Sequence, residues 1–541
     1  MSTLLKYCNT IRHLKPHQIT GRILYNFKRR TGLIRPSTPP QLHLNGTKTH
    51  VPFIHHDPWN NQKEILKGNF TFLHVTHRTG FPPDWSAENM SLLWRYNLHY
   101  FHFLYLLHRD TKVELARHWI DHNASGSKPG WDPYPLSLRI VNWIKAGLYE
   151  SDILDSLYKQ ASYLYRSIEY FYSGNHLLEN ARALIFAGIY FNGNGEAENW
   201  LATGLKIYRE ELPSQVLPDG GYYERSPMYH SLILEGILDV LNFLGPEHAD
   251  YTFFKGYAKE MLDFLVSMKH PDGSIALFND ATTEIAPPPD RIIRYGREVI
   301  GYEAATRSSF DSAGYYIIDD DPLYCVIDGG AVGPDHLPAH AHADIFSYEL
   351  SVAGKKMIVD TGVYEYQHGE MREYVRSTRA HNTVCIDGID QVECWDSFRV
   401  ARRYKPYNVT FKNENGCRIF RGSYDGYAHL IGDNIVHSRE IKYDTAERNI
   451  VVKDIIDGKN THHVVSRIHL HPDCKVSTTG ENIFIQRGTI IINIKSIKNK
   501  QYTIVNSWYC PRFGVKLSNK VIEFVEDREL PVEITYVIDF S

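Results

Sequence analysis

Histidine and aspartate residues in the second half of the chain are spaced in a pattern that suits metal binding. His340 and His342 alternate with alanine before a strand-like run, so an extended backbone would turn both rings to one side. A second short strand pattern ends at Asp360, and a third segment delivers His381 beside Asn382. Imidazole and carboxylate groups that meet at strand ends are typical of a zinc site with one open position. The alternative is that each histidine satisfies a hydrogen bond near a strand end.

A second group of candidate residues lies earlier, in the sequence NHLLEN that begins at Asn175. If this run opens a helix, His176 and Glu179 share one face, with Asn175 at the N-terminal end where backbone N–H groups attract anions. The alternative is a capping asparagine followed by an ordinary surface glutamate. Farther along, Tyr229 belongs to an aromatic segment whose tyrosines would by default be core residues.

The elements that would carry these residues change in type near residue 311. From about 85 to 300, apolar residues recur at spacings of three and four between short polar or Gly/Pro breaks, which predicts helices. Two breaks match, because Leu-Pro-Asp-Gly at 217–220 and His-Pro-Asp-Gly at 270–273 each follow a predicted helix. Recurring helical hairpins with matched turns favour an α/α toroid. The clearest helical segments are 92–107, 136–148, 153–171, 232–244 and 257–268.

Beyond residue 311 apolar residues recur at every second position, as in β-strands. Short β-branched or aromatic runs bounded by Gly, Asn, Asp, Pro or Lys predict a large antiparallel β-sandwich. These runs are 315–319, 323–328, 451–456, 483–486, 489–494 and 532–538. The expected class is therefore an α+β multidomain protein, with an N-terminal extension at 1–45, an α/α toroid at 46–310 and a β-sandwich at 311–541.

Length and composition agree with two large domains. A chain of 541 residues exceeds one ordinary core, and a net charge of −4 gives no general attraction to nucleic acid. An anionic partner must therefore be met by local basic patches. The 36 tyrosines and 9 tryptophans weakly favour carbohydrate, whose faces pack on flat aromatic rings.

The expected location is cytoplasmic. The seven cysteines lack Cys-x-x-Cys spacing and predict neither a disulfide framework nor a thiolate zinc site, which fits a reducing compartment. The N-terminal stretch has no apolar core with a small-residue cleavage site, and no later run reaches transmembrane length. Apolar and basic residues between 11 and 30 do predict an amphipathic helix, either packed on its own domain or in weak contact with an anionic membrane surface.

The motif that begins HAHADIFSYEL at His340, continues with VDTG and ends with RSTRAHNTVCIDG resembles the C-terminal domain of the heparinase II/III family of polysaccharide lyases. The resemblance implies a toroid joined to a sandwich. It also assigns His340 to the active site, and His342, Asp360 and His381 to a structural zinc ion.

The same resemblance extends to the toroid. Family toroids carry an Asn-His pair followed by an E-x-S-P-x-Y-H segment, matched here by ERSPMYH at 224–230. This implies that Asn175, His176, Glu179 and Tyr229 belong to the active site. Tyr366, fifteen residues before His381, is placed like a further active-site tyrosine, and Tyr374 is the alternative.

These residue types suit β-elimination on a uronic acid. The proton on C5 is weakly acidic, so donors must neutralise the neighbouring carboxylate and stabilise an enolate-like intermediate. Asn175 and His176 can donate there. A base must take the proton and an acid must protonate the bridge oxygen, and Tyr229 or a nearby histidine can do either.

Further polar and aromatic residues are candidates for substrate binding, with packing or solvated charge as the alternative for each. They are Tyr96, Asn97, His99, Trp131, Arg139 and Asn142 in the toroid, and Arg372, Arg376 and Trp395 in the sandwich.

The leading functional hypothesis is a lyase acting on an anionic glycan linked to a bacterial surface or capsule. A uronate C5-epimerase would use the same proton abstraction and the same residues. A glycoside hydrolase would need two carboxylates flanking the bond, for which Asp132, Glu179 and Glu224 are candidates. A glycan-binding protein without catalysis would leave the polysaccharide unchanged.

Overall fold

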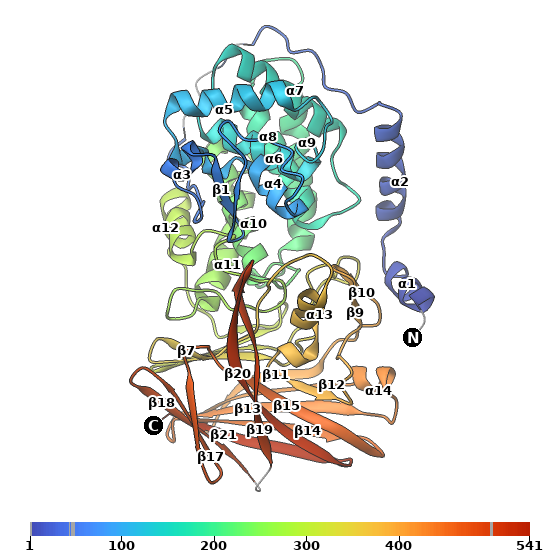
Figure 1. The fold of residues 1–541 in the computed structure, drawn as a ribbon, viewed down its shortest axis with the longest axis vertical. Coiled ribbons are helices and arrows are strands. Elements are labelled where there is room, and N and C mark those ends of the chain that lie inside the picture. The colour runs from blue at the N-terminus through green and yellow to red at the C-terminus, as the bar shows by residue number, and fades with distance from the viewer. Residues whose placement is uncertain (1–2, 43, 45–48, 498–500, 541) are drawn as a thin grey trace.

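The computed structural model, which describes residues 3–42, 44, 49–497 and 501–540, stacks a helical half on a half built from β-strands (Figure 1). This arrangement confirms the α+β multidomain class. The helical half contains α3 (Gln62–Leu66), α4 (Leu92–Tyr100), η1 (His102–Leu106), α5 (Arg109–His122), α6 (Pro133–Lys145), α7 (Ser151–Arg166), α8 (Gly174–Tyr190), α9 (Ala197–Gln215), α10 (Pro227–Leu244), α11 (Tyr251–Met268) and α12 (Pro289–Ile300). It also carries a small hairpin of β1 (Asn69–Phe72) and β2 (Val75–Arg78).

The predicted helices are present, and one is interrupted. The pattern at 92–107 gives α4 and then the short η1, because Phe101 between them has a left-handed φ of 62° that ends the α-helix. Apolar side chains from these helices form one continuous core.

The two matched turns of the sequence have matching structures. Each follows a long helix, α9 or α11, and ends in a glycine with positive φ, +88° at Gly220 and +86° at Gly273. Backbone bridges pair Val216 with Tyr222 across the first turn and Lys269 with Ile275 across the second. Both turns therefore return the chain toward the β half, where the loops after them meet the sandwich.

The β half is an antiparallel sandwich. Its largest sheet has the order β11-β12-β13-β14-β21-β18-β17-β16, and it shares one core with sheets of order β3-β4-β5-β6-β7 and β19-β20-β15-β8. The large sheet is built from β11 (Tyr407–Glu414), β12 (Cys417–Tyr424), β13 (Val436–Asp444), β14 (Asn449–Asp457), β16 (Lys475–Thr479), β17 (Asn482–Arg487), β18 (Ile490–Ser496) and β21 (Val532–Asp539). The others use β3 (Ser309–Phe310), β4 (Tyr315–Asp320), β5 (Leu323–Asp328), β6 (Tyr348–Val352), β7 (Lys355–Ile358), β8 (Val384–Ile386), β15 (Thr461–His469), β19 (Tyr502–Arg512) and β20 (Val515–Glu529).

The sheet that contains β4 and β5 joins the two halves. Ile318 on one face of β4 belongs to the sandwich core, whereas Ile317 on the other face packs in a cluster with Phe264 and Met268 of α11. Because alternate side chains of a strand point to opposite faces, both faces of this sheet are buried. The toroid is thereby fixed over one end of the sandwich.

The predicted amphipathic helix at 11–30 is two helices, α1 (Thr3–Ile11) and α2 (Pro16–Arg30). The break precedes Pro16, because the residue before a proline disfavours helical backbone and Lys15 is extended, with ψ of 144°. Among the described residues, no helix is both long enough and apolar enough to cross a membrane.

Candidate active site

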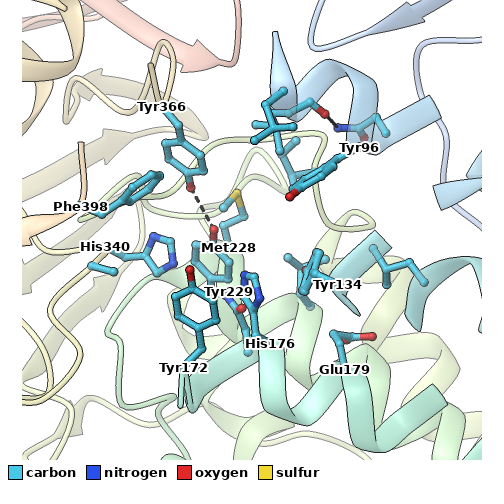
Figure 2. Close-up of a pocket in the computed structure, with 18 of the residues that line it drawn as sticks. Tyr96, Tyr134, Tyr172, His176, Glu179, Met228, Tyr229, His340, Tyr366 and Phe398 are labelled. Atoms are coloured by element: carbon cyan, nitrogen blue, oxygen red, sulfur yellow. Dashed lines mark hydrogen bonds between the residues drawn. The ribbon is translucent and has the colours of Figure 1, made fainter. Parts of the chain in front are cut away.

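A cavity of about 1300 Å³ lies between the toroid and the sandwich. All six residues that the sequence predicts to be catalytic line it, which are Asn175, His176, Glu179 and Tyr229 from the toroid and His340 and Tyr366 from the sandwich. Figure 2 shows the side chains from the two halves facing one another across it. Small-molecule pockets reach about 1,000 Å³. The cavity is therefore large enough for several sugar units.

Tyr229, His340 and Tyr366 form one cluster. Tyr229 lies in the first turn of α10, where the Ser226 hydroxyl caps the helix by accepting the Tyr229 backbone N–H at 3.4 Å. Its ring lies 4.0 Å from the His340 ring, and its hydroxyl lies 3.1 Å from that of Tyr366 (Figure 2). Burial raises the pKa of Tyr229 well above its usual value, and the neighbouring Tyr366 raises it further. The phenol is therefore protonated at neutral pH and can act as an acid.

His340 is held between two carboxyl groups. Its Nδ1 lies 2.9 Å from Asp280 Oδ2, and its Nε2 lies 3.3 Å from Glu224 Oε2. Burial alone would raise the pKa of Asp280. The charge of Arg372, together with the hydrogen bonds that Asp280 accepts from His340 and His342, instead holds the pKa of Asp280 well below its usual range. If the ionised Asp280 accepts the Nδ1 proton, then Nε2, which faces Glu224 in the cavity wall, is the atom that can exchange a proton.

Glu224 connects this histidine to the start of α8. Burial raises the pKa of Glu224, and His340 opposes that shift. The carboxyl group also accepts the backbone N–H of Asn175. Gly174 permits this approach, because its φ is +58° and an added Cβ would lie 2.7 Å from Glu224 Oε1. The local backbone therefore fixes Asn175 next to the residues contributed by the sandwich.

His176 is partly exposed in the cavity, between the rings of Tyr134 at 4.4 Å and Tyr172 at 5.1 Å. Its Nδ1 lies 3.1 Å from Glu169 Oε2. Burial would lower the pKa of His176, but the charge of Glu169 and the hydrogen bond to it outweigh burial and raise the pKa. The ring is thereby suited to carry positive charge toward an acidic ligand.

Glu179 lies deeper in the wall. It pairs with Arg182 at 3.3 Å, and Arg182 also pairs with Asp239, which Lys145 contacts at 2.5 Å. Burial raises the pKa of Glu179, although Arg182 opposes the shift. Glu179 therefore belongs to a buried ionic network beneath the cavity.

The predicted metal ligands lie next to His340, but one member of the set differs: Asp344, and not Asp360, groups with His342 and His381. His342 Nδ1, His381 Nε2 and Asp344 Oδ1 are buried and have no hydrogen-bond partner among the described residues, and the three groups can offer ligand atoms within 4.8 Å of one another. Asp360, the third residue expected to bind metal, instead lies 2.8 Å from the other ring nitrogen of His381. Asp280 likewise holds the other nitrogen of His342, also at 2.8 Å.

This geometry fits a zinc ion. Histidines that bind zinc usually donate their second ring N–H to a carboxylate, as His342 does to Asp280 and His381 does to Asp360. The unpartnered atoms are two imidazole nitrogens and a carboxylate oxygen, which is a common zinc ligand set.

Three of the predicted substrate-binding residues line the cavity, namely Tyr96, Asn97 and Asn142. The Tyr96 hydroxyl donates to Asp132 at 3.0 Å. The amides of Asn97 and Asn142 donate to backbone carbonyls of their own wall, at 2.9 and 2.7 Å. These residues therefore shape the wall, and Tyr96 contributes an aromatic ring to it.

Three others lie inside the toroid, away from the cavity. His99 accepts the Trp119 indole N–H at 2.9 Å, and Trp131 donates to a backbone carbonyl at 3.0 Å. Arg139 is fully buried over the Trp119 ring and donates to Gln160 at 2.8 Å. Their polar atoms serve the toroid core, so the expectation that they meet substrate does not agree with their positions.

The remaining predicted contacts support the sandwich side of the site. Arg372 is buried against Asp280, and Arg376 is buried and donates to the backbone carbonyls of Ala341 and nearby loops. Trp395 packs against Tyr7 of α1, with ring centres 4.8 Å apart. None of these three side chains lines the cavity formed by the described residues.

Sequence reasoning missed Asp280 and Glu169, the carboxylates that orient His340 and His176, and Asp344 in the metal cluster. Glu224 was considered only as a hydrolase residue. One signal was present, because Glu224 and Asp280 each follow one of the two matched turns by a few residues. Such single acidic residues in loops have no spacing pattern that distinguishes them from solvated ones.

Comparison with known proteins agrees with this fold. The family model described as "Heparinase II/III-like, C-terminal" matches residues 303–534, and the model described as "Heparinase II/III N-terminus" matches residues 148–288. The chain therefore belongs to the heparinase II/III-like family, as its sequence motifs predicted.

Individual relatives are distant. A heparin-sulfate lyase of Pedobacter heparinus is 26% identical over 269 residues, covering 44% of this chain and 40% of that relative. One of Bacteroides stercoris is 29% identical over 255 residues, covering 41% and 37%. The matched stretch thus spans about two fifths of these curated relatives.

Solved structures match over more of the chain. The crystal structure of heparinase III has a TM-score of 0.69 at 16% identity and covers 97% of this chain and 93% of its own. A heparan sulfate lyase HepC mutant from Pedobacter heparinus has a TM-score of 0.62 at 17% identity, covering 97% and 88%. At these identities the likeness concerns the fold.

Proposed function

We propose that the protein cleaves a uronic-acid-containing polysaccharide by β-elimination. The observation that carries the proposal is the contact between Tyr229 and His340, whose ring centres lie 4.0 Å apart, in a cavity that Asn175 and His176 also line. An acid, a base and two donors for a carboxylate thus share one space of about 1300 Å³. The matches to proteins named heparin-sulfate lyase support the same reaction class.

In this proposal each group has one role. Asn175 and the cationic ring of His176 bind the uronate carboxylate and stabilise the enolate-like charge that develops on it. His340 Nε2 removes the C5 proton, while Asp280 on Nδ1 stabilises the resulting imidazolium. Tyr229 gives its proton to the bridge oxygen as the C4–O bond breaks and the C4–C5 double bond forms. No water is consumed, and Tyr366 at 3.1 Å can relay a proton back to Tyr229.

Elimination is favoured over epimerisation by the placement of acid and base. The rings of Tyr229 and His340 lie side by side, with centres 4.0 Å apart, so in this proposal both groups reach the sugar from the same side. A C5-epimerase must return a proton to the opposite face. The hydrolase alternative has less support, since Glu179 is held by Arg182 and Asp132 accepts the Tyr96 hydroxyl.

The test is incubation with a panel of uronate glycans, including bacterial capsular ones, while the ultraviolet absorbance of the unsaturated product is recorded. A lyase gives rising absorbance and shorter chains. Deuterium entering C5 from heavy water without new absorbance would indicate an epimerase. Binding with neither change would indicate a glycan-binding protein and contradict the proposal.

We also propose that His342, His381 and Asp344 hold a structural zinc ion, with Asp360 and Asp280 orienting the two rings. The buried ligand atoms without partners support this proposal. The ion would supply a rigid crosslink between the segments that carry His340 and His381, and no step of the elimination passes through it.

A weak contact with an anionic membrane is a further proposal, for the outer face of α2. Leu24 and Phe27 are 52% and 57% exposed, do not line the cavity, and lie near the basic helix end at Arg29 and Arg30. Co-sedimentation with phosphatidylserine vesicles, lost in Phe27→Glu, tests it. Equal sedimentation of both proteins would contradict it.

A further inference from the structure

The helices α1 and α2, here called the N-terminal arm (residues 3–30), connect the two halves along one side of the cavity. At the sandwich end, the arm binds the small hairpin of β9 (Cys394–Trp395) and β10 (Arg399–Val400). The Trp395 indole donates to Thr10 at 3.1 Å, and Arg399 donates to the Tyr7 hydroxyl at 3.1 Å. These contacts anchor α1.

At the toroid end, α2 packs on the segment between α7 and α8. The rings of Tyr25 and Phe171 lie 5.0 Å apart, and an added Cβ on Gly21 would lie 3.3 Å from the Cβ of Phe171. Gly21 therefore lets the helix approach closely. Gln18, which is buried, donates to the backbone carbonyl of His336 at 3.2 Å, just before the His340 segment.

The inner face of the arm lines the cavity. Ile11, Gln18, Ile19, Arg22 and Asn26 all contribute to its wall. Both matched family models begin after the arm, at residues 148 and 303. The arm is therefore a wall of the active-site cavity that neither family model covers.

Arg22 differs from the other cations on this cavity. The remaining lysine and arginine side chains that line it are Lys145, Arg182 and Arg399, and each is paired with a carboxylate. Among the described residues Arg22 has no carboxylate partner, and its guanidinium lies 5.9 Å from the centre of the Tyr172 ring. An exposed, unpaired arginine can bind a carboxylate through two parallel hydrogen bonds.

The position of Arg22 relates it to the reacting sugar. Tyr172 lies between Arg22 and His176, with its ring 5.1 Å from that of His176. A carboxylate held by Asn175 and His176 would leave Arg22 on the far side of Tyr172. Arg22 is therefore placed for the acidic group of another sugar in the same chain, with Tyr172 as a stacking surface between the two.

We infer that the arm forms a glycan subsite in which Arg22 binds an acidic group of a sugar neighbouring the one that reacts. The inference rests on the proposed function, since it requires an acidic glycan in this cavity. It assigns to Arg22 a role in affinity and in selection for repeated negative charge. Because the contact is the same before and during reaction, it acts on KM and leaves kcat unchanged.

The test compares Arg22→Gln with Arg22→Lys, which keeps the charge, and with Arg30→Gln, which removes an exposed arginine of the same helix that does not line the cavity. The Tyr229→Phe background prevents turnover during binding. The probe is an unsulfated hexasaccharide of alternating glucuronic acid and N-acetylglucosamine, together with the same hexasaccharide after reduction of its carboxyl groups. Calorimetry measures both affinities.

Arg22→Gln should weaken binding of the acidic probe about tenfold, the scale of one charge-assisted hydrogen-bonded contact, and leave binding of the reduced probe unchanged. Arg22→Lys should restore part of the loss, and Arg30→Gln should bind like the parent. Equal affinity of the parent and Arg22→Gln for the acidic probe would overturn this inference alone. A parent that binds neither probe and gives no unsaturated product with any glycan of the panel would overturn both the inference and the proposed function.

Discussion

The two walls of the cavity hold their histidines in opposite ways. His176 on the toroid wall is partly exposed and has one carboxylate partner, Glu169. His342 behind the sandwich wall is fully buried, and Asp280 binds it together with His340 and Arg372. A histidine that must meet substrate needs solvent access, whereas one that fixes geometry needs buried partners. In the proposed function, the toroid wall would therefore bind the glycan and the sandwich wall would hold the base rigidly.

The largest effect should come from Asp280, because it serves the whole sandwich wall. Asp280→Asn keeps the shape but removes the charge that offsets buried Arg372 and orients both histidines. Removing one partner of a buried ion pair costs about 3–5 kcal/mol. We expect a large loss of stability in chemical unfolding and loss of turnover in any folded fraction. A variant of normal stability would contradict the buried network.

Tyr229→Phe should lower kcat by about a hundredfold or more, since it removes the acid and keeps the ring. Thermal unfolding and affinity for an oligosaccharide should match the parent. Tyr366→Phe is the matched comparison, because it removes the hydroxyl at 3.1 Å from Tyr229 and should cost less if Tyr366 only relays the proton. Near-normal turnover in Tyr229→Phe would move the role of acid to Tyr366.

Measuring bound metal tests whether a zinc ion stabilises the sandwich wall. The purified protein should carry about one zinc equivalent per chain, and chelation or His342→Ala should lower the melting temperature more than it alters specificity. Asp344→Ala should abolish zinc binding, whereas Asp360→Asn should weaken it about 10–100-fold, as expected for a group that orients a ligand. If Asp360→Asn had the larger effect, Asp360 would be the ligand, as the sequence pattern predicted.

The sequence predicted residues in short motifs on both walls better than isolated residues. Asn175, His176, Tyr229 and His340 lie in short motifs, and the change of apolar period from 3.6 to 2 separated the domains that carry them. These features depend on neighbours in sequence, so they could be predicted without coordinates.

Residue type alone was a poor guide to the rest. Arg139 and Trp131 have the chemistry of glycan contacts but point into the toroid core, where Arg139 finds Gln160 and the Trp119 ring. Conversely Asp280 is an isolated acidic residue in a loop, and only the packing of the toroid loop against the sandwich brings it to His340. Which way a side chain faces, and what it meets across a domain boundary, depends on tertiary packing.

The smallest expected effect concerns His176 on the toroid wall, and it should appear in the pH dependence of glycan affinity. In the folded protein Glu169 raises the pKa of His176 against the opposing effect of burial, so the imidazolium persists to higher pH than in an isolated histidine. The pair stabilises the fold fully at pH below the unfolded pKa of about 6.5, and this stability is lost as pH rises through the raised folded pKa. Affinity for an acidic glycan should fall over the same interval, because the cation becomes neutral.

Glu169→Gln removes the charge that raises the pKa and keeps the size of the side chain. The rise of KM with pH should therefore begin at lower pH than in the parent, and KM at neutral pH should increase roughly two- to fivefold, the scale of a partly exposed ion pair. His176→Gln should remove the pH dependence of KM altogether while leaving the contribution of Asn175. Measuring kcat and KM from pH 5 to 9 for the three proteins separates these outcomes. A parent and Glu169→Gln with coincident KM profiles would show that His176 does not bind the glycan as a cation, and Asn175 would then be the main donor to the carboxylate.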